Sequence, residues 1–342
     1  MSEILIRIEG RAGRITLNRP EALNALTDGM IRAIDAALDE WRGDARVDLA
    51  LIDAAGPRAF AAGGDIRDLY DRGRAGDFEF GRRFWAFEYA LNAKIARYPK
   101  PYVAIMHGFV MGGGVGVSAL GSHRVATDST QLAMPECGIG LVPDVGGSWL
   151  LARAPGRAGE YLGMTGARMG PGDAIHAGFA DVYAPEAKLE ALKEKLVETG
   201  DAGVIAGFSE TAPPGDLLRF RAEIDAMFSA ADPVELEARL EAAPSPWAEA
   251  ALKALRRGCP LSVACAMEMA RAARGLSLEE ALAREYRFTA RCMEQGEFLE
   301  GVRAAVIDKD RKPNWAKPRL ADIRRADVEA MLAPLGAGEL TL

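Results

Sequence analysis

The sequence predicts an α/β protein in which a layer of largely parallel strands fills roughly the first 190 residues and a helical region follows. Strand-like runs of branched residues alternate with amphipathic helical runs in the first part, which favours a parallel α/β layer. From about residue 187 onward Ala, Glu, Leu and Arg dominate, in segments such as EAKLEALKEKLVETG and LEEALAREYRFTARCMEQ. The 342 residues are 49% hydrophobic and 27% charged, a balance that excludes disordered, collagen-like and coiled-coil chains.

The first elements follow from local patterns. Two runs of branched residues at 4–8 and 14–17, joined through glycines, predict a β-hairpin. Thr27 can cap a helix whose apolar positions recur at helical spacing up to Trp41. Residues 47–54 are apolar enough to predict a buried strand.

The pattern continues to about residue 190. We expect a helix over 84–97, a buried strand over 102–106 and then a glycine-rich turn that opens a helix reaching about residue 120. Short strands follow at 124–127 and 131–133, and the pattern turns helical after Pro143. We therefore divide the chain into a core of residues 1–190 and a helical C-terminal region of residues 191–342.

Charge and cysteine content limit the partners and the compartment. Lys and Arg number 42 against 49 Asp and Glu, so the net charge of −7 disfavours binding to nucleic acid or anionic lipid. The four cysteines and three histidines show no metal-ligand or disulfide spacing, and the N-terminus lacks a signal-peptide pattern, so we expect a cytoplasmic protein. Residues 101–122 are uncharged, but their six glycines favour buried strand, turn and helix over a membrane span.

Two glycine-rich turns are candidate anion sites. The motifs of an NTPase, a dinucleotide oxidoreductase, an α/β-hydrolase and a zinc protease are missing from the sequence. The turns FAAGGD at 60–65 and HGFVMGGGVG at 107–116 each precede a predicted helix. Free backbone N–H groups at such positions can hold a developing oxyanion, and glycine permits its close approach. The alternative is that both are ordinary tight turns.

An acidic loop supplies two candidate catalytic carboxylates. Glu136 and Asp144 are separated by glycines and a proline in MPECGIGLVPDVGG, which predicts a loop that folds back so that both side chains reach one site. The apolar surroundings would raise their pKa values, which suits acid–base or nucleophilic work. The alternative roles are a helix cap for Asp144 and a surface charge for Glu136.

Four segments together carry a family resemblance. NRPEALNAL, AFAAGGDIRDLY, KPYVAIMHGFVMGGGVGVS and AMPECGIGLVPDVGG occur in this order within residues 3–190. With them, the chain resembles the crotonase, or enoyl-CoA hydratase/isomerase, superfamily. FWAFEYALNAKIARYPKPYVAIMHG and the tail EYRFTARCMEQGEFLEGVRAAVIDKDRKPNW make it most similar to the 3-hydroxyisobutyryl-CoA hydrolase subfamily.

The resemblance implies a fold and an activity. The fold would be a crotonase-like spiral of repeated ββα units, and the activity would be hydrolysis of an acyl-CoA thioester in valine degradation. The thioester oxygen would be held by the backbone N–H groups of Gly64 and Gly113. Glu136 and Asp144 would be the catalytic carboxylates, and Glu88 would contact the substrate. No separate cofactor is expected, because coenzyme A is part of the substrate.

The resemblance leaves alternatives open. Glu136 would either attack the carbonyl to form a mixed anhydride or act as a general base on water. Enoyl-CoA hydratases use two glutamates, of which the second matches Glu136 and the first falls at Gly116. Gly116 has no side chain to orient water, so hydratase or isomerase activity is only the second hypothesis. A non-catalytic acyl-CoA-binding or RNA-binding relative is the third. Trimers are usual in the superfamily, so a homo-oligomer is one possible state, and the alternative is that the long helical C-terminal region packs on its own subunit.

Overall fold

The computed structural model describes residues 2–342, and the chain divides into two compact units. Unit 1 consists of residues 1–64, 90–133 and 168–218, and unit 2 of residues 65–89, 134–167 and 219–342. This division differs from the boundary expected at residue 190. At residue 190 the composition changes from strand-like to helical segments. Each compact unit nevertheless contains segments from both sides of that residue.

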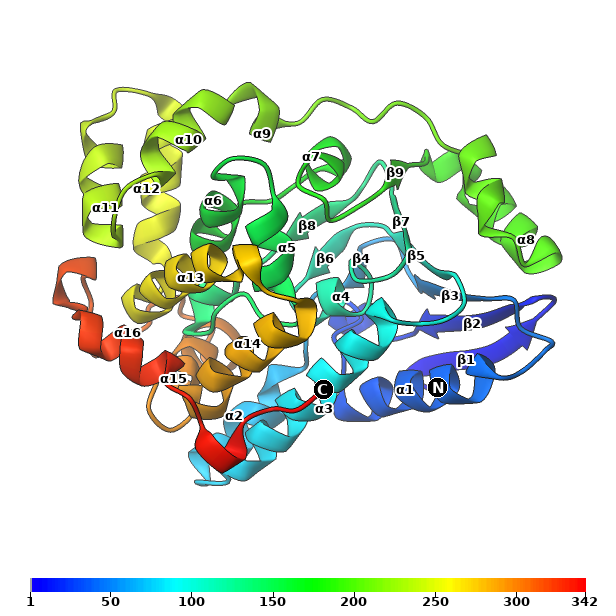
Figure 1. Ribbon diagram of the computed structural model, residues 1–342, viewed down its shortest axis with the longest axis horizontal. Coiled ribbons are helices and arrows are strands. Elements are labelled where there is room, and N and C mark those ends of the chain that lie inside the picture. The colour runs from blue at the N-terminus through cyan, green and yellow to red at the C-terminus, as the bar shows by residue number, and fades with distance from the viewer. Residues whose placement is uncertain (1) are drawn as a thin grey trace. The chain divides into compact units, whose positions relative to one another are not determined.

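Unit 1 contains two sheets (Figure 1). The larger sheet has the strand order β1-β2-β3-β5-β7-β9, and the smaller sheet has the order β4-β6-β8. The larger sheet is formed by β1 (Ile4–Glu9), β2 (Ala12–Leu17), β3 (Leu49–Ala54), β5 (Tyr102–Met106), β7 (His123–Ala126) and β9 (Val182–Tyr183). The smaller sheet is formed by β4 (Ala59–Ala61), β6 (Phe109–Met111) and β8 (Gln131–Ala133). The expected hairpin of β1 and β2 is antiparallel, and every other strand pair is parallel.

The order of the strands describes a spiral. The chain passes from the larger sheet to the smaller one three times, from β3 to β4, from β5 to β6 and from β7 to β8. Helical segments follow each of these strand pairs before the chain returns to the larger sheet. The predicted spiral of repeated ββα units is therefore confirmed.

Helices of unit 1 bury their apolar faces against the larger sheet. They are α1 (Asp28–Arg42), α7 (Pro171–His176) and α8 (Leu189–Thr199). Helix α4 (Gly113–Gly116) packs instead against β4 and β6 of the smaller sheet, and α9 (Asp216–Arg219) lies at the unit boundary. The Met30 N–H donates to the Thr27 hydroxyl at 3.2 Å, which confirms the predicted cap. Alternate side chains of the strands pack with α8 in one buried cluster that includes Leu51, Val103 and Leu192. Burial of such side chains is the main stabilising contribution to the unit.

The helix expected to reach residue 120 is shorter than predicted. Helix α4 ends at Gly116, and Val117 caps it. Glycine loses more backbone entropy in a helix than any other residue, so a segment this rich in glycine gains little from further helical turns. The segment up to Leu120 is still buried, as the apolar pattern indicates.

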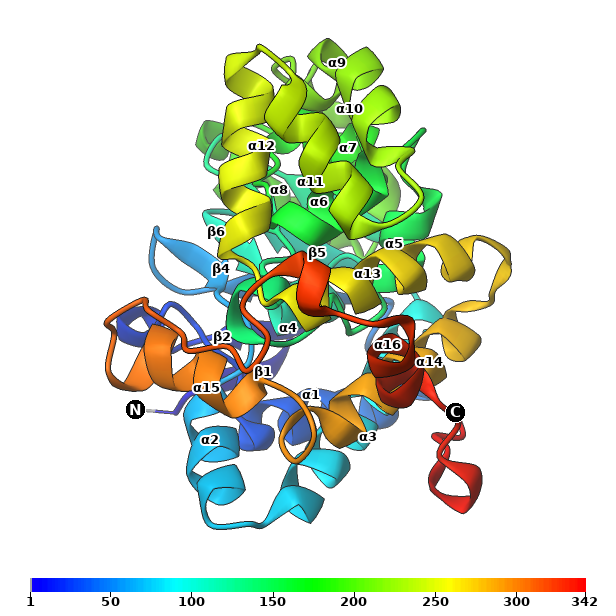
Figure 2. The same cartoon turned by 90° about the vertical axis from the view of Figure 1, so that its left-hand side faces the viewer.

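Unit 2 is helical. Its helices are α2 (Ile66–Arg74), the first part of α3 (Phe78–Ala96), α5 (Gly147–Arg153), α6 (Ala158–Thr165), α10 (Arg221–Phe228), α11 (Pro233–Ala242), α12 (Pro246–Arg257), α13 (Pro260–Ala272), α14 (Leu278–Cys292), α15 (Phe298–Val302) and α16 (Arg325–Leu332). Helices α10, α11 and α12 lie side by side (Figure 2). Ser277 and Glu280 form a capping box at the start of α14, so this helix has a well-defined first turn. Within residues 2–342, no helix has the length and apolar character needed to cross a bilayer.

Candidate active site

The smaller sheet of unit 1 aligns the two glycine-rich turns. Strands β4 and β6 are parallel neighbours, with Ala61 opposite Val110. Gly64 follows the carboxyl end of β4, and Gly113 follows the carboxyl end of β6. Because the carboxyl ends of parallel strands meet at the same edge, both turns lie at one edge of the smaller sheet.

Glycine is required at the turns for two reasons. Gly63 has φ +109° and Gly112 has φ +50°, and side chains other than glycine rarely adopt such values. At Gly114 the reason is space, because a Cβ atom there would lie 2.7 Å from the carbonyl oxygen of Ala61. The absence of a side chain thus lets the start of α4 approach β4 closely.

One amide group in each glycine-rich turn, that of Gly64 and that of Gly113, is available to a ligand. Among residues 2–342, neither the Gly64 N–H nor the Gly113 N–H donates a hydrogen bond to another backbone group. Gly113 is buried and Gly64 is partly buried, so their N–H groups are shielded from bulk water. Two such donors can stabilise a developing negative charge on an oxygen atom. Their role as an oxyanion hole remains a prediction.

Unit 2 brings the three predicted carboxylates together with a fourth. We call Glu88, Glu136, Asp144 and Glu285 the carboxylate cluster. Glu88 lies on α3, Glu136 begins the 3₁₀ turn Glu136–Ile139, Asp144 lies in the loop before α5, and Glu285 lies on α14. All four are buried, with at most 4% of each residue exposed. The alternative roles considered for Glu136 and Asp144 are therefore wrong: Glu136 is not a surface charge, and Gly146 rather than Asp144 caps α5.

Tyr89 is the hydrogen-bond partner of Asp144. Its hydroxyl group donates to Asp144 Oδ2 at 2.7 Å and lies 3.5 Å from the Thr289 hydroxyl. Burial raises the pKa of Asp144 to about 7, although the bond from Tyr89 opposes this shift. A carboxyl group with a pKa near neutrality can both give and take a proton under ordinary conditions.

Glu136 has an oxygen atom without a partner. Its Oε2 is buried, and no described residue donates a hydrogen bond to it. Burial, and then the charge of Asp144, raise the pKa of Glu136 well above its usual range. Glu88 shows the same two causes in the same order, and its pKa is also raised. Buried polar atoms are rarely left unpaired, so the free oxygen of Glu136 points to a role with a substrate or water.

Glu285 was not predicted from the sequence. It accepts hydrogen bonds from the Gly146 N–H at 2.8 Å, from the Ser148 N–H at 2.9 Å and from the Ser148 hydroxyl. Burial raises its pKa to about 8 in spite of these bonds. One signal in the sequence could have revealed it. Glu285 occupies the apolar face of the α14 segment, at helical spacing from Leu278, Ala281 and Leu282, where a charged residue is unusual.

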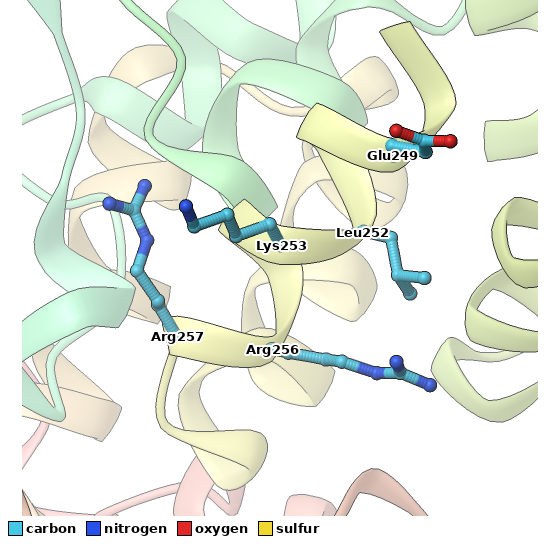
Figure 3. A pocket seen from close by; sticks show the side chains of 5 residues that line it. All are labelled: Glu249, Leu252, Lys253, Arg256 and Arg257. Atoms are coloured by element: carbon cyan, nitrogen blue, oxygen red, sulfur yellow. The ribbon is translucent and has the colours of Figure 1, made fainter. Parts of the chain in front are cut away.

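A hollow of about 410 Å³ lies along α12, lined by Glu249, Leu252, Lys253, Arg256 and Arg257 (Figure 3). Lys253 and Arg257, one turn apart, point to the same side, whereas Arg256 points away from them. Arg256 pairs with Glu237 and Glu241, but Lys253 and Arg257 have no ion pair with any residue of the described part of the chain. The hollow therefore carries two cationic groups without an ion pair, and Glu249 contributes a carboxylate to its lining.

This basic side of α12 is connected to the carboxylate cluster through the backbone. The Cys259 N–H, two residues after Arg257, donates a hydrogen bond of 2.7 Å to the carbonyl oxygen of Cys137. Cys137 directly follows Glu136 in the same 3₁₀ turn. The end of α12 thus lies beside the segment that carries Glu136.

The spiral of unit 1 and the buried acidic loop of unit 2 define a protein of the crotonase fold. In agreement, the family described as enoyl-CoA hydratase/isomerase matches residues 12–332, and the chain belongs to this family. A 3-hydroxyisobutyryl-CoA hydrolase, described as mitochondrial, from Danio rerio is 39% identical, over 100% of this chain and 92% of its own length. The corresponding human protein is 37% identical, over 99% of this chain and 90% of its own length.

Two solved structures share the whole fold. A structure titled as an enoyl-CoA hydratase from Rhodobacter sphaeroides 2.4.1 has a TM-score of 0.95 and 53% identity, with 100% of both chains covered. A structure titled as a carnitinyl-CoA dehydratase from Mycobacterium thermoresistibile has a TM-score of 0.95 and 41% identity, covering 100% of this chain and 99% of the other. The names of these relatives thus include two kinds of chemistry, thioester hydrolysis and the addition or removal of water.

Proposed function

We propose that the protein hydrolyses the thioester of 3-hydroxyisobutyryl-CoA to 3-hydroxyisobutyrate and coenzyme A, a step of valine degradation. Curated relatives with this name align over the full length of the chain. The observation that carries the proposal is the buried pair of Glu136, with a free oxygen, and Asp144, with a pKa of about 7. Hydrolysis needs a group that attacks or activates water and a group that transfers a proton to the leaving sulfur.

The reaction distributes these tasks among four residues. The N–H groups of Gly64 and Gly113 hold the thioester oxygen while negative charge develops on it. Glu136 in its ionised form attacks the carbonyl carbon or removes a proton from the attacking water. The C–S bond then breaks, and Asp144 transfers a proton to the departing thiolate. Where Glu136 itself attacks, the acyl group stays on it as a mixed anhydride, and water then hydrolyses the anhydride, which releases 3-hydroxyisobutyrate and returns a proton to Asp144. The raised pKa values of both carboxyl groups make these transfers feasible near neutral pH.

Glu88 is our candidate for recognition of the acyl group. It is buried and it is close enough to Asp144 for the charge of Asp144 to raise its pKa. A 3-hydroxyl group is small and polar, and inside a protein it needs a hydrogen-bond partner. We propose that Glu88 supplies that partner.

Addition or removal of water, the chemistry for which the two solved structures are named, is the second candidate. The hydratases of this family use a first glutamate that falls at Gly116 in this chain. Gly116 is buried in α4 and has no side chain that could position water. We therefore place hydrolysis ahead of hydration.

The nucleotide end of the substrate carries phosphate groups and needs cations. Lys253 and Arg257 are exposed, unpaired and one turn apart, and like charges at this spacing repel one another on a helix. A phosphate group beside them would remove this repulsion. We propose that they bind a phosphate of the substrate.

The proposal is tested by following thiol release spectroscopically. The purified protein should release coenzyme A from 3-hydroxyisobutyryl-CoA, and Glu136→Gln should abolish this release. Rapid hydration of crotonyl-CoA without thiol release would instead show a hydratase, and tight binding of coenzyme A without turnover would show a non-catalytic relative. A panel of acyl-CoA thioesters defines the selectivity.

The cytoplasmic location remains a proposal, since the curated relatives are described as mitochondrial. The homo-oligomeric state is likewise a proposal.

A further inference from the structure

The loop that carries Asp144 contains a strained turn. The Gly147 N–H donates to the carbonyl oxygen of Asp144 at 2.6 Å, so residues 144–147 form a tight turn. Its two central residues, Val145 and Gly146, have φ values of +54° and +83°. Both values are positive, as in a type I′ turn. Glycine suits such a turn, but valine does not, because its branched side chain is rarely found in the left-handed region.

Something outside the turn must hold Val145 in this conformation. A residue in a sparsely populated region persists only where the surrounding structure imposes it. The side chain of Val145 is almost completely buried, and the N–H groups of Gly146 and Ser148, which follow it in the chain, both donate to Glu285. Glu285 Oε2 accepts from the Gly146 N–H and Oε1 accepts from the Ser148 N–H. One carboxyl group therefore holds the backbone on the C-terminal side of Val145.

Glu285 accepts hydrogen bonds but has no cationic partner among the described residues. It is fully buried, and no described lysine, arginine or histidine forms an ion pair with it. A buried carboxylate without a cation is expensive to keep, and burial accordingly raises its pKa to about 8. An apolar residue at this place on α14 would be less costly for stability. The hydrogen bonds to the loop give a reason for the glutamate.

From these contacts we infer that Glu285 is a positioning residue for the proposed hydrolysis. From α14, its carboxyl group binds the amides of Gly146 and Ser148, an arrangement that we call the clamp. The clamp fixes the strained turn and so the position of Asp144 relative to Tyr89. The inference rests on the proposed function for the role of Asp144, while the clamp itself rests on the three hydrogen bonds to Glu285. The C-terminal helical region thereby takes part in presenting the acidic loop.

Glu285→Gln is the most direct test. The amide oxygen of glutamine can still accept from Ser148, but its NH₂ group then faces the Gly146 N–H. One of the two hydrogen bonds from backbone amides is therefore lost. We expect kcat to fall at least about tenfold while KM changes less than about threefold, since a small displacement of a catalytic group is sufficient for such a loss. Ser148→Ala keeps both hydrogen bonds from backbone amides to Glu285, so its kcat should fall much less.

A double-mutant cycle separates positioning from a general loss of stability. If Glu285 acts by fixing Asp144 against Tyr89, the losses in kcat from Glu285→Gln and Tyr89→Phe will not add. Glu160→Gln is the matched control, because Glu160 is also a buried glutamate of unit 2 but pairs with Arg157 and Arg274. It should lower the melting temperature and leave kcat unchanged. Additive losses, or an unchanged kcat in a folded Glu285→Gln protein, would overturn the inference.

Amide hydrogen exchange tests the clamp without any turnover. The Gly146 and Ser148 amides should be protected in the native protein, and Gly146 should exchange at least about tenfold faster in Glu285→Gln, with α14 unaffected. If the native protein releases no coenzyme A, the proposed function fails, and the exchange rates still decide whether the clamp exists. Unchanged exchange at Gly146 would contradict the clamp even in an active hydrolase.

Discussion

The hydroxyl group of Tyr89 donates a hydrogen bond of 2.7 Å to Oδ2 of Asp144, in a region where both residues are buried. This bond joins α3, which carries Tyr89, to the loop before α5, which carries Asp144. It favours the ionised form of Asp144 and opposes the effect of burial. The balance between burial and the hydrogen bond from Tyr89 sets the protonation state of Asp144, the proposed proton donor.

Tyr89→Phe should therefore move the pH profile. Without the hydroxyl group, the pKa of Asp144 rises further above about 7, because the hydrogen bond from Tyr89 no longer opposes burial. Because protonated Asp144 gives its proton to the departing thiolate in the proposed reaction, the basic limb of kcat/KM shifts to higher pH by on the order of one unit. The measurement is a pH–rate profile with 3-hydroxyisobutyryl-CoA.

Tyr286→Phe is the control for that change. Its ring lies 6.4 Å from the ring of Tyr89, but its pKa is raised by burial and then by the charge of Glu79, with Arg82 opposing, and not by Asp144. Removing its hydroxyl group should leave the basic limb in place. An identical profile for the native protein and Tyr89→Phe would show that the bond to Asp144 does not control the reaction.

Glu136→Gln should separate stability from activity. The folded pKa of Glu136 is raised, so the folded protein keeps a proton that the unfolded chain releases above about pH 4.5. Stability from this group therefore falls as the pH rises toward the folded pKa, and glutamine removes that loss. We expect Glu136→Gln to have a higher melting temperature than the native protein at pH 8 and little difference at pH 4.5.

Thiol release by Glu136→Gln should at the same time fall by about a thousandfold or more, because the attacking or water-activating group is lost. Thermal unfolding at the two pH values and the thiol assay are measured on the same preparations. A lower melting temperature at pH 8 would mean that the carboxyl group has a stabilising partner, and retained thiol release would remove Glu136 from the mechanism.

The proposed phosphate site predicts an effect on substrate binding alone. Lys253→Gln and Arg257→Gln together should raise KM about tenfold or more and leave kcat within about twofold, with the difference shrinking at high salt. Arg256→Gln is the matched control on the same helix, since Arg256 already pairs with Glu237 and Glu241. An equal rise of KM in the control, or none in the double variant, would locate the phosphates elsewhere.

Local patterns predicted most of the fold because each of them has a local cause. The hairpin, the Thr27 cap and the strand of residues 102–106 follow from side chains that are neighbours in sequence. The spiral came from the family resemblance, since the pairing of β4 with β6 joins segments that are far apart in the chain. The length of α4 was overestimated, because an apolar pattern shows burial but not the entropy lost by glycine.

The site was predicted in part for the same reason. Glu136 and Asp144 share one loop, and their apolar neighbours indicated burial before the structure was known. Glu285 lies 141 residues after Asp144 in the numbering, and no local pattern connects them. Only the fold of unit 2 brings the α14 carboxyl group to the amides of Gly146 and Ser148.

Gly114→Ala tests whether the two glycine-rich turns act together. The new Cβ atom would lie 2.7 Å from the carbonyl oxygen of Ala61, in the backbone of β4, so the start of α4 must move away from β4. The N–H of Gly113 then shifts relative to that of Gly64, and the two donors no longer point at one oxygen. Loss of one oxyanion donor typically lowers kcat by a factor of about 10² to 10³, and we expect a fall in this range.

Gly43→Ala provides the comparison, because nothing lies within 4 Å of a Cβ atom at that position and its φ is −102°. It should fold normally and keep the native kcat. Gly114→Ala should bind the substrate with a KM within about threefold of the native value, since the amides act on charge that appears only in the transition state. If the folded variant instead keeps its kcat, the smaller sheet does not align an oxyanion hole, and the thioester oxygen must be stabilised by other groups.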